Sequence, residues 1–254
     1  MEPRAVVFGR EAGAYEAARP GYPAEAVRHV LARTEVRSAV EVGAGTGKAT
    51  ESFAPLVEEI VCVEPSAAMA AVLQGKALPG VEVVVAPLER WTGPEAPVDL
   101  VYAAQAWHWV DHSTAYARVR DMLRPGGVVA LIWNLHGDRD RGRYELFADV
   151  YRSHAPEVLN EWDERIRRRD TETWLDELAT AGFESVDLFT HQWSRSMSPE
   201  GARALYATYS DHIMIPEPRR SRLLEALEEA VRDRGDEVTL DYRTNVFSGV
   251  NPGQ

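Results

Sequence analysis

The 254-residue chain has little cysteine, little positive charge and no long apolar run. Its single cysteine, Cys62, excludes a disulfide framework within the chain and is expected to be a buried strand thiol. Its 40 acidic and 28 basic residues give a net charge of −12, so we expect neither nucleic acid nor a membrane as partner. No apolar run reaches the ~18 residues of a membrane span. The first ten residues lack the apolar core of a signal peptide, so we expect a cytoplasmic protein.

Apolar strand patterns alternate with helical patterns along the chain, which is typical of an α/β domain with a mainly parallel sheet. The last two predicted strands are joined by a long helical connection, so we expect the sheet to finish with an antiparallel edge. A helical excursion over residues 134–180 interrupts the alternation. The seven predicted strands cover residues 38–44, 59–66, 81–87, 98–104, 128–133, 183–193 and 237–247. Helices are expected to be capped by Ser66, by Asp111 or Ser113, and by Asp170, with Gly182 ending the last of these helices.

A glycine-rich loop follows the first predicted strand and is typical of a nucleotide-like ligand. It is not a phosphate-binding P-loop, because Gly43 and Gly47 are one residue too close and Ala49 replaces the magnesium-binding hydroxyl. A dinucleotide site needs its third glycine where Lys48 stands. A dinucleotide site stays possible, but Lys48 does not allow the close packing between helix and strand that a third glycine permits.

An acidic residue at the end of the second predicted strand supports an adenosine ligand. Glu64 lies 19 residues after Gly45, near the spacing of about 20 expected for a carboxylate that binds ribose hydroxyls. Sites for NAD and sites for other adenosine cofactors both use a carboxylate at this position to bind the ribose. Glu64 therefore does not choose between them.

The loop, with Glu41 before Gly43, Gly45 and Gly47, resembles motif I of the class I S-adenosylmethionine-dependent methyltransferases. Residues 101–111 and 122–132, and the pattern Tyr-x-x-x-Arg-Pro-x-Tyr-Pro beginning at Tyr15, resemble the small-molecule methyltransferase family often labelled type 11. The resemblance runs from about residue 8 to residue 133 and fades afterwards.

The resemblance implies a single class I methyltransferase domain over residues 1–254, with a Rossmann-like sheet, helices on both faces and S-adenosylmethionine as cofactor. Glycines let the backbone approach the ribose and the amino-acid end of the cofactor, and Glu41 favours its ammonium group. The residues expected to contact the cofactor are Tyr15, Arg19, Glu41, Gly43, Gly45, Gly47, Glu64, Pro65, Pro87, Leu88, Ala103 and Gln105.

His108 is the candidate catalytic residue, as a general base or an orienting group, because histidine titrates near neutral pH. A structural histidine is the alternative interpretation. His108 and His112 are four residues apart, but the helix is expected to begin near Asp111 and no third ligand accompanies them. We therefore expect no metal site.

Two segments outside the regular alternation are expected to cover the site: residues 1–33 as an N-terminal lid, and residues 134–180 on the acceptor side. Arg19 is expected either to hold a carboxylate, of the cofactor or of the acceptor, or to be a solvated loop residue. The predicted reaction is methyl transfer to an oxygen, in a carboxylate or hydroxyl, or to a nitrogen or carbon of a small molecule. The predicted state is a monomer or homodimer.

Two other classes remain as alternatives. An NAD(P)-dependent oxidoreductase shares the glycine loop and Glu64, but the chain has no Tyr-x-x-x-Lys pair for proton relay. A non-catalytic S-adenosylmethionine-binding module is expected to have a damaged cofactor loop, whereas this loop is intact.

Overall fold

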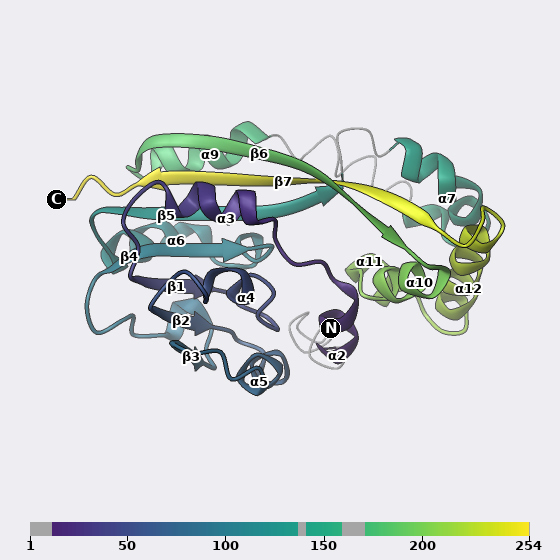
Figure 1. Cartoon of the computed structure of the whole chain (residues 1–254), viewed down its shortest axis with the longest axis horizontal. Coiled ribbons are helices and arrows are strands. Elements are labelled where there is room, and N and C mark those ends of the chain that lie inside the picture. The colour runs from purple at the N-terminus through teal and green to yellow at the C-terminus, as the bar shows by residue number, and fades with distance from the viewer. Residues whose placement is uncertain (1–11, 137–140, 159–170, 254) are drawn as a thin grey trace.

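The computed structural model describes residues 12–136, 141–158 and 171–253, and its strands form one seven-stranded sheet (Figure 1). The order across the sheet is β3-β2-β1-β4-β5-β7-β6. Strands β1 to β5 pair in parallel, and β7 lies antiparallel between β5 and β6. The predicted seven-stranded, mostly parallel sheet is confirmed, with β7 as its antiparallel strand and β6 at the edge. The strands are β1 (Ser38–Val42), β2 (Glu59–Val63), β3 (Val81–Val84), β4 (Val98–Ala104), β5 (Leu123–His136), β6 (Glu184–Met197) and β7 (Val238–Val250).

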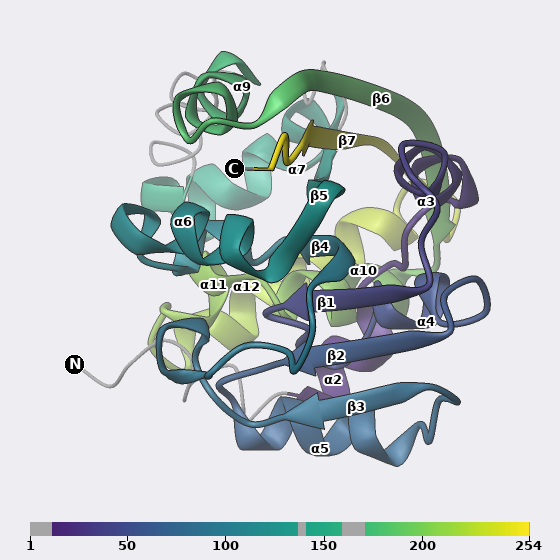
Figure 2. The same cartoon turned by 90° about the vertical axis from the view of Figure 1, so that its left-hand side faces the viewer.

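Helices cover both faces of the sheet, as predicted (Figure 2). Helices α3, α4 and α5 pack on one face, and α6 and α9 pack on the other. The helices are α2 (Ala12–Ala18), α3 (Ala24–Leu31), α4 (Thr50–Phe53), α5 (Ala67–Gly75), α6 (His112–Met122), α7 (Arg141–His154), α9 (Thr171–Thr180), α10 (Pro199–Ala207), α11 (Ser210–Ile213) and α12 (Arg219–Arg232), with short 3-10 helices η1 (Leu88–Arg90) and η2 (Trp107–Trp109).

The central strands are apolar on both sides because each side meets a layer of helices. In β1, Val40 and Val42 face the core beneath α6 and α9, whereas Ala39 faces the core beneath α3 and α4. In β5, Leu131 and Ile132 divide between the same two cores. The alternation of side chains along each strand thus places the sheet in the middle of three layers.

Local sequence signals set several helix ends. Ser66 caps α5 by accepting a hydrogen bond from the backbone N–H of Met69. Asp111 caps α6 by accepting from the backbone N–H of Ser113 at 3.0 Å. Gly182 follows α9 with φ +84°, the left-handed conformation that commonly ends a helix. These ends agree with the sequence prediction.

A further core lies beyond the ends of the central strands. There the long strands β6 and β7 pack with α2, α7, α10 and α12. The predicted excursion begins later than expected, because β5 continues through residue 134 to His136. Helix α7 belongs to this outer core, whereas α9 packs back on the sheet. The predicted helix cap Asp170 lies outside the described residues.

The parallel strands point their carboxyl ends toward the group formed by α10, α11 and α12 (Figure 1). Helix α2 lies between this group and α5, in contact with both α10 and α5. In open α/β sheets ligands bind beyond the carboxyl ends of the strands, so we expect the site where these ends face the helices. Within the described part of the chain, no helix is long and apolar enough to cross a membrane.

Candidate active site

The glycine loop after β1 adopts a backbone that favours glycine at all three positions. Gly43, Gly45 and Gly47 have φ values of +69°, +58° and +88°. Two of them are also closely packed: a Cβ on Gly43 would lie 2.5 Å from the Cβ of Ala106, and one on Gly47 would lie 2.4 Å from Leu73 Cδ1. These two glycines allow the loop to pack against neighbouring elements.

Gly45 differs from the other two because the space beside it is open. A Cβ there would meet only the sulfur of Met69, at 3.9 Å. Its glycine therefore leaves the backbone accessible at the loop crest, where an adenosine cofactor can approach closely. The open crest has room for S-adenosylmethionine, and the predicted contact of Gly45 with the cofactor stays a prediction.

Glu64 is joined to the loop by its carboxylate. Its Oε2 accepts from the backbone N–H of Gly45 at 2.8 Å, and its Oε1 accepts from the backbone N–H of Ser66 at 2.8 Å. The residue is 5% exposed. Burial raises the pKa of the Glu64 carboxyl, and the two backbone hydrogen bonds oppose that rise. Each oxygen keeps a second lone pair, which a ribose hydroxyl can use.

Glu41 lies beneath the loop, within the core. Its Oε2 accepts from Thr50 Oγ1 at 2.6 Å and from the Tyr102 hydroxyl at 2.8 Å, with Cys62 Sγ at 3.8 Å. Burial raises the pKa of Glu41 to about 7, against the effect of these donors. Glu41 thereby connects β1 with β4 and with the helix that follows the glycine loop. Cys62 is buried, as expected.

The other residues predicted at the strand ends divide by exposure. Pro65 is exposed beside Glu64, and Pro87 is half-buried after β3. Leu88 and Ala103 are buried in the core beneath α6. The two prolines are thus accessible to a ligand at the strand ends, whereas the side chains of Leu88 and Ala103 are not.

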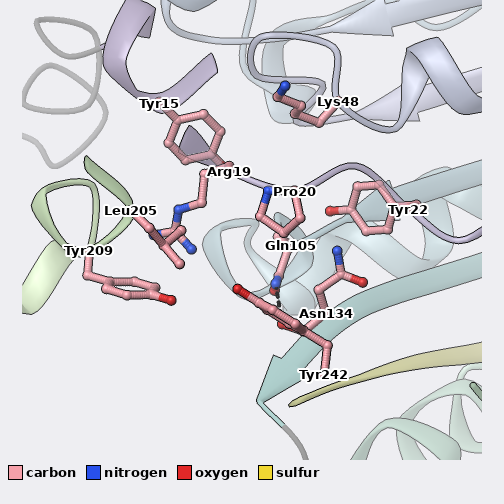
Figure 3. Close-up of a pocket in the computed structure, with 10 residues that line it drawn as sticks. All are labelled: Tyr15, Arg19, Pro20, Tyr22, Lys48, Gln105, Asn134, Leu205, Tyr209 and Tyr242. Carbon is pink, nitrogen blue, oxygen red and sulfur yellow. Dashed lines mark hydrogen bonds between the residues drawn. The ribbon is translucent and has the colours of Figure 1, made fainter. Parts of the chain in front are cut away.

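A pocket opens where the strand ends meet α2 and α10 (Figure 3). It brings together Tyr15, Arg19 and Gln105 from the residues predicted to contact the cofactor. The pocket is mainly polar, with four tyrosines and two amide side chains. The full lining is Tyr15, Arg19, Pro20, Tyr22, Lys48, Gln105, Asn134, Leu205, Tyr209 and Tyr242.

Sequence reasoning missed Leu205, Tyr209 and Tyr242, which come from α10, the α10–α11 connection and β7. They lie after residue 133, where the family resemblance fades. The only sequence signal for them is the apolar pattern of their own helix and strand, which does not distinguish a pocket wall from ordinary core.

Gln105 has an unusual backbone at the end of β4. Its φ is +57°, a conformation that is uncommon for residues other than glycine and that occurs at functional sites. Its backbone N–H donates to the carbonyl of Ile132 at 2.9 Å, and its Nε2 donates to the carbonyl of Asn134 at 2.7 Å (Figure 3). These bonds fix the amide at the edge of the pocket.

Arg19 connects the N-terminal segment to the helical group. Its Nε donates to Thr208 Oγ1 at 2.9 Å and its Nη2 donates to the Thr208 carbonyl at 3.0 Å. The guanidinium carbon lies 4.2 Å from the ring centre of Tyr209 and 5.3 Å from that of Tyr15, within the range of cation–π attraction. Arg19 is therefore held by packing and two hydrogen bonds at the pocket wall.

Helix α2 is joined to the cofactor loop by an ion-pair cluster around Glu16. Its Oε1 lies 2.9 Å from Lys48 Nζ and 2.8 Å from Lys76 Nζ. Lys76 also pairs with Glu51 at 3.0 Å. These are the two lysines of the sequence. Burial alone would raise the pKa of Glu16, but the bonds from the lysines bring it below its usual value.

His108 lies on η2 as an exposed residue beside the exposed ring of Trp109, 4.6 Å between ring centres. It is not part of the pocket lining described above. Trp107 is fully buried in the core. His112 approaches the Trp107 carbonyl at 3.0 Å and Glu177 at 3.4 Å, so it joins α6 to α9. The two histidines have different surroundings and do not form a pair.

The strand order, the glycine loop after β1 and the carboxylate at the end of β2 define a class I methyltransferase fold. The methyltransferase domain profile matches residues 40–131. An uncharacterised methyltransferase of Mycobacterium tuberculosis (strain ATCC 25618 / H37Rv) is 32% identical over 222 residues, covering 87% of this chain and 84% of that protein. The chain belongs to this methyltransferase family.

Other comparisons agree. The trans-aconitate 2-methyltransferase of Azoarcus sp. (strain BH72) is 40% identical over 115 residues, covering 42% of this chain and 44% of that protein. Phosphoethanolamine N-methyltransferase 2 of Haemonchus contortus, solved with S-adenosyl-L-methionine, has a TM-score of 0.56 at 14% identity, covering 96% of this chain and 57% of that one. The chain is an S-adenosylmethionine-dependent methyltransferase.

Proposed function

We propose that this enzyme methylates a carboxylate oxygen of a small organic acid. The observation that carries the proposal is the state of Arg19 in the pocket. Its hydrogen-bond acceptors among the described residues, the hydroxyl and carbonyl of Thr208, are uncharged. Lys48, the other cation of the lining, is instead paired with Glu16. A carboxylate acceptor complements the Arg19 charge with charge-assisted hydrogen bonds.

The rest of the lining supports a small, oxygen-rich acceptor. Gln105 and Asn134 supply amide groups, and the tyrosines supply hydroxyls around them. Pro20 and Leu205 are the apolar members, too few to favour a long hydrocarbon. A relative is named for methylating trans-aconitate, which is consistent with a carboxylate acceptor.

The cofactor is placed by the strand ends in this proposal. Glu64 accepts from the ribose hydroxyls while the Gly45 backbone approaches the ligand closely. Pro65 and Pro87 flank the adenine, supported by Leu88. When bound, S-adenosylmethionine supplies a methyl group carried on a positively charged sulfur.

The amino-acid end of the cofactor lies toward the acceptor pocket. Tyr15, Arg19 and Gln105 line that side, with Ala103 in the strand behind them. Gly43 and Gly47 shape the loop. Glu41 supports it from beneath, because its carboxylate is directed to buried donors. Aromatic rings near a sulfonium add cation–π attraction.

The chain's own residues contribute alignment and exclusion of water. A carboxylate attacks a methyl group without losing a proton, so no general base is needed. Arg19 and the pocket amides would hold and orient the acceptor carboxylate, and the surrounding lining would exclude water from it. The predicted base role of His108 therefore applies only to a hydroxyl or a protonated amine acceptor, for which this exposed histidine has to approach the site.

The covering segments are also part of the proposal. The lid, residues 1–33, closes over the cofactor. Its described part is held by Glu16, by Arg19 and by the carbonyl of Ala18, which accepts from Arg195 Nη1 at 2.9 Å. The 134–180 segment shapes the acceptor side, beginning with Asn134.

The test is a methyl-transfer screen with isotope-labelled S-adenosylmethionine and a panel of small carboxylic acids, each matched to its primary amide and alcohol. We expect label in an acid as an alkali-labile methyl ester detected by mass spectrometry. Arg19→Ala abolishes this transfer, and Arg19→Lys reduces it because lysine cannot form the two-pronged contact. Label in amides or alcohols instead, or unchanged transfer by Arg19→Ala, contradicts the proposal.

A further inference from the structure

A line of hydrogen bonds crosses the sheet from its edge to the pocket. Trp193 Nε1 on β6 donates to Thr244 Oγ1 on β7 at 2.9 Å. Thr244 Oγ1 donates to Asn134 Oδ1 on β5 at 2.6 Å. Asn134 Nδ2 donates to the carbonyl of Gly21 in the N-terminal segment at 3.0 Å. We propose that Thr244 is a positioning residue, which acts through Asn134 to hold Gly21 and Gln105 at the wall of the acceptor pocket.

The direction of this line follows from the chemistry of its members. An indole N–H can only donate, so Thr244 Oγ1 must accept from Trp193 and directs its single proton elsewhere. That proton goes to Asn134 Oδ1, which sets the orientation of the Asn134 amide. Its NH2 group then faces the Gly21 carbonyl. The hydroxyl of Thr244, a residue with 0% exposure, thereby determines that Asn134 directs its NH2 group to the N-terminal segment.

Asn134 connects two pocket walls at once. Its side chain holds Gly21, which stands between Arg19 and Tyr22 of the lining. Its backbone carbonyl accepts from Gln105 Nε2 at 2.7 Å. Movement of Asn134 would therefore displace both the lid and the strained end of β4.

Trp193 supports a third wall from the same side of the sheet. Its ring stacks on Tyr242 of the lining, with 4.5 Å between ring centres and 13° between planes. Thr244 is two residues after Tyr242 on β7 and pairs directly with Asn134 on β5. The two central members, Thr244 and Asn134, are thus fixed by strand register as well as by hydrogen bonds.

The same strands contain a bond that serves as a matched control. Thr190 Oγ1 on β6 donates to Asn245 Oδ1 on β7 at 3.0 Å. This is also a threonine bonded to an asparagine across neighbouring strands, but neither residue belongs to the pocket lining. Loss of this hydroxyl tests sheet stability alone.

The experiment is hydrogen–deuterium exchange of the full chain saturated with S-adenosylhomocysteine, read at helix α2. A seven-residue helix is protected only while it is docked, so its amide exchange reports how the lid is held. Thr244→Val keeps the shape and removes the hydroxyl. We expect exchange in α2 about tenfold faster than in wild type, while Thr190→Val leaves it unchanged.

Two further variants keep the test decisive. Thr244→Ser retains the hydroxyl, and we expect it to restore the exchange rate of α2. Trp193→Phe keeps a ring on Tyr242 but removes the first donor, and a several-fold increase is expected even if Thr244→Val does not fold. Equal α2 exchange in Thr244→Val and Thr190→Val, or no change in Trp193→Phe, overturns the inference. It rests on the proposed lid and pocket, but the readout needs no acceptor, so a wrong acceptor class leaves this result unaffected.

Discussion

The carboxylate of Glu64 accepts a hydrogen bond of 2.8 Å from the backbone N–H of Gly45, the open crest of the glycine loop. The other oxygen accepts from the backbone N–H of Ser66, the residue that caps α5. The residue expected to bind the ribose is therefore also the one that joins the loop to the end of β2. Cofactor affinity and loop order depend on the same side chain.

Glu64→Ala is expected to weaken binding of S-adenosylhomocysteine by about 1.5–3 kcal/mol, the usual range for hydrogen bonds to a charged group. It should also lower the melting temperature, because two backbone N–H groups lose their partner. Glu64→Gln keeps one acceptor oxygen, so its affinity and its melting temperature should lie between those of wild type and Glu64→Ala. Calorimetric titration measures the affinity, and thermal unfolding measures the melting temperature. Unchanged affinity in Glu64→Ala would show that the ribose is held elsewhere.

Alanine at Gly45 and at Gly47 should separate ligand approach from packing. Both positions are left-handed, so each alanine costs about 1–2 kcal/mol of backbone strain. At Gly47 the new Cβ also meets Leu73, whereas at Gly45 it enters open space. We expect Gly47→Ala to melt at the lower temperature. Gly45→Ala should stay folded yet bind S-adenosylhomocysteine at least about tenfold more weakly, since a methyl group of this kind costs roughly 1–3 kcal/mol when a fitted site is overpacked.

If Gly45→Ala binds the cofactor product as tightly as wild type, the loop crest is not the contact surface. Binding is measured by calorimetry at a temperature where both variants are folded. The comparison with Gly47→Ala then shows whether any loss comes from the ligand or from the loop itself.

Glu41 should make the free energy of unfolding fall as the pH rises toward neutrality. Burial raises its pKa to about 7 from an ordinary 4.5. Between these values the folded chain holds a proton that the unfolded chain has released, so folding is favoured at the lower pH and the advantage is lost by pH 7. The difference between the two pKa values corresponds to roughly 3 kcal/mol.

Glu41→Gln removes this titration. Denaturant unfolding between about pH 5 and pH 7.5 should show that wild type loses roughly 2–3 kcal/mol more than the variant over this range. The difference between the two proteins cancels the titrating groups that do not interact with Glu41, and leaves only the small effect of its repulsion by Glu64. Parallel pH profiles for the two proteins contradict the assignment.

The cluster around Glu16 should make lid docking depend on charge. Glu16→Gln removes the carboxylate shared by Lys48 and Lys76, so exchange of the α2 amides should rise several-fold and become less sensitive to salt. Glu51→Gln removes a partner of Lys76 without touching α2 and serves as the control. Equal exchange in the two variants would assign the holding of α2 to its other contacts, through Arg19, Asn134 and the Ala18 carbonyl.

Local signals in the sequence were sufficient for the parts of the fold that depend on neighbours in the chain. The glycine loop, the strand-end Glu64 and the caps Ser66 and Asp111 all follow from short-range chemistry, and the structure confirms their places. The parallel sheet followed from the alternation of strands and helices. Features that depend only on residues close together in the sequence were predictable in this way.

Contacts between distant segments were not predictable. Arg19 bonds to Thr208, 189 residues later, and Asn134 bonds to Gly21, 113 residues earlier. No local pattern encodes such a pairing, because it depends on how β6 and β7 extend to the outer helices. For the same reason Tyr209 was missed as a pocket wall.

In the proposed complex, the strand ends present the cofactor's methyl to the pocket beneath the N-terminal segment. A crystal structure of the full chain with S-adenosylhomocysteine measures this most directly. We expect the ribose hydroxyls on Glu64, the adenosine against the Gly45 backbone, and the sulfur facing the space between Arg19 and Gln105. A ribose bound away from Glu64, or a sulfur directed away from that pocket, would contradict it.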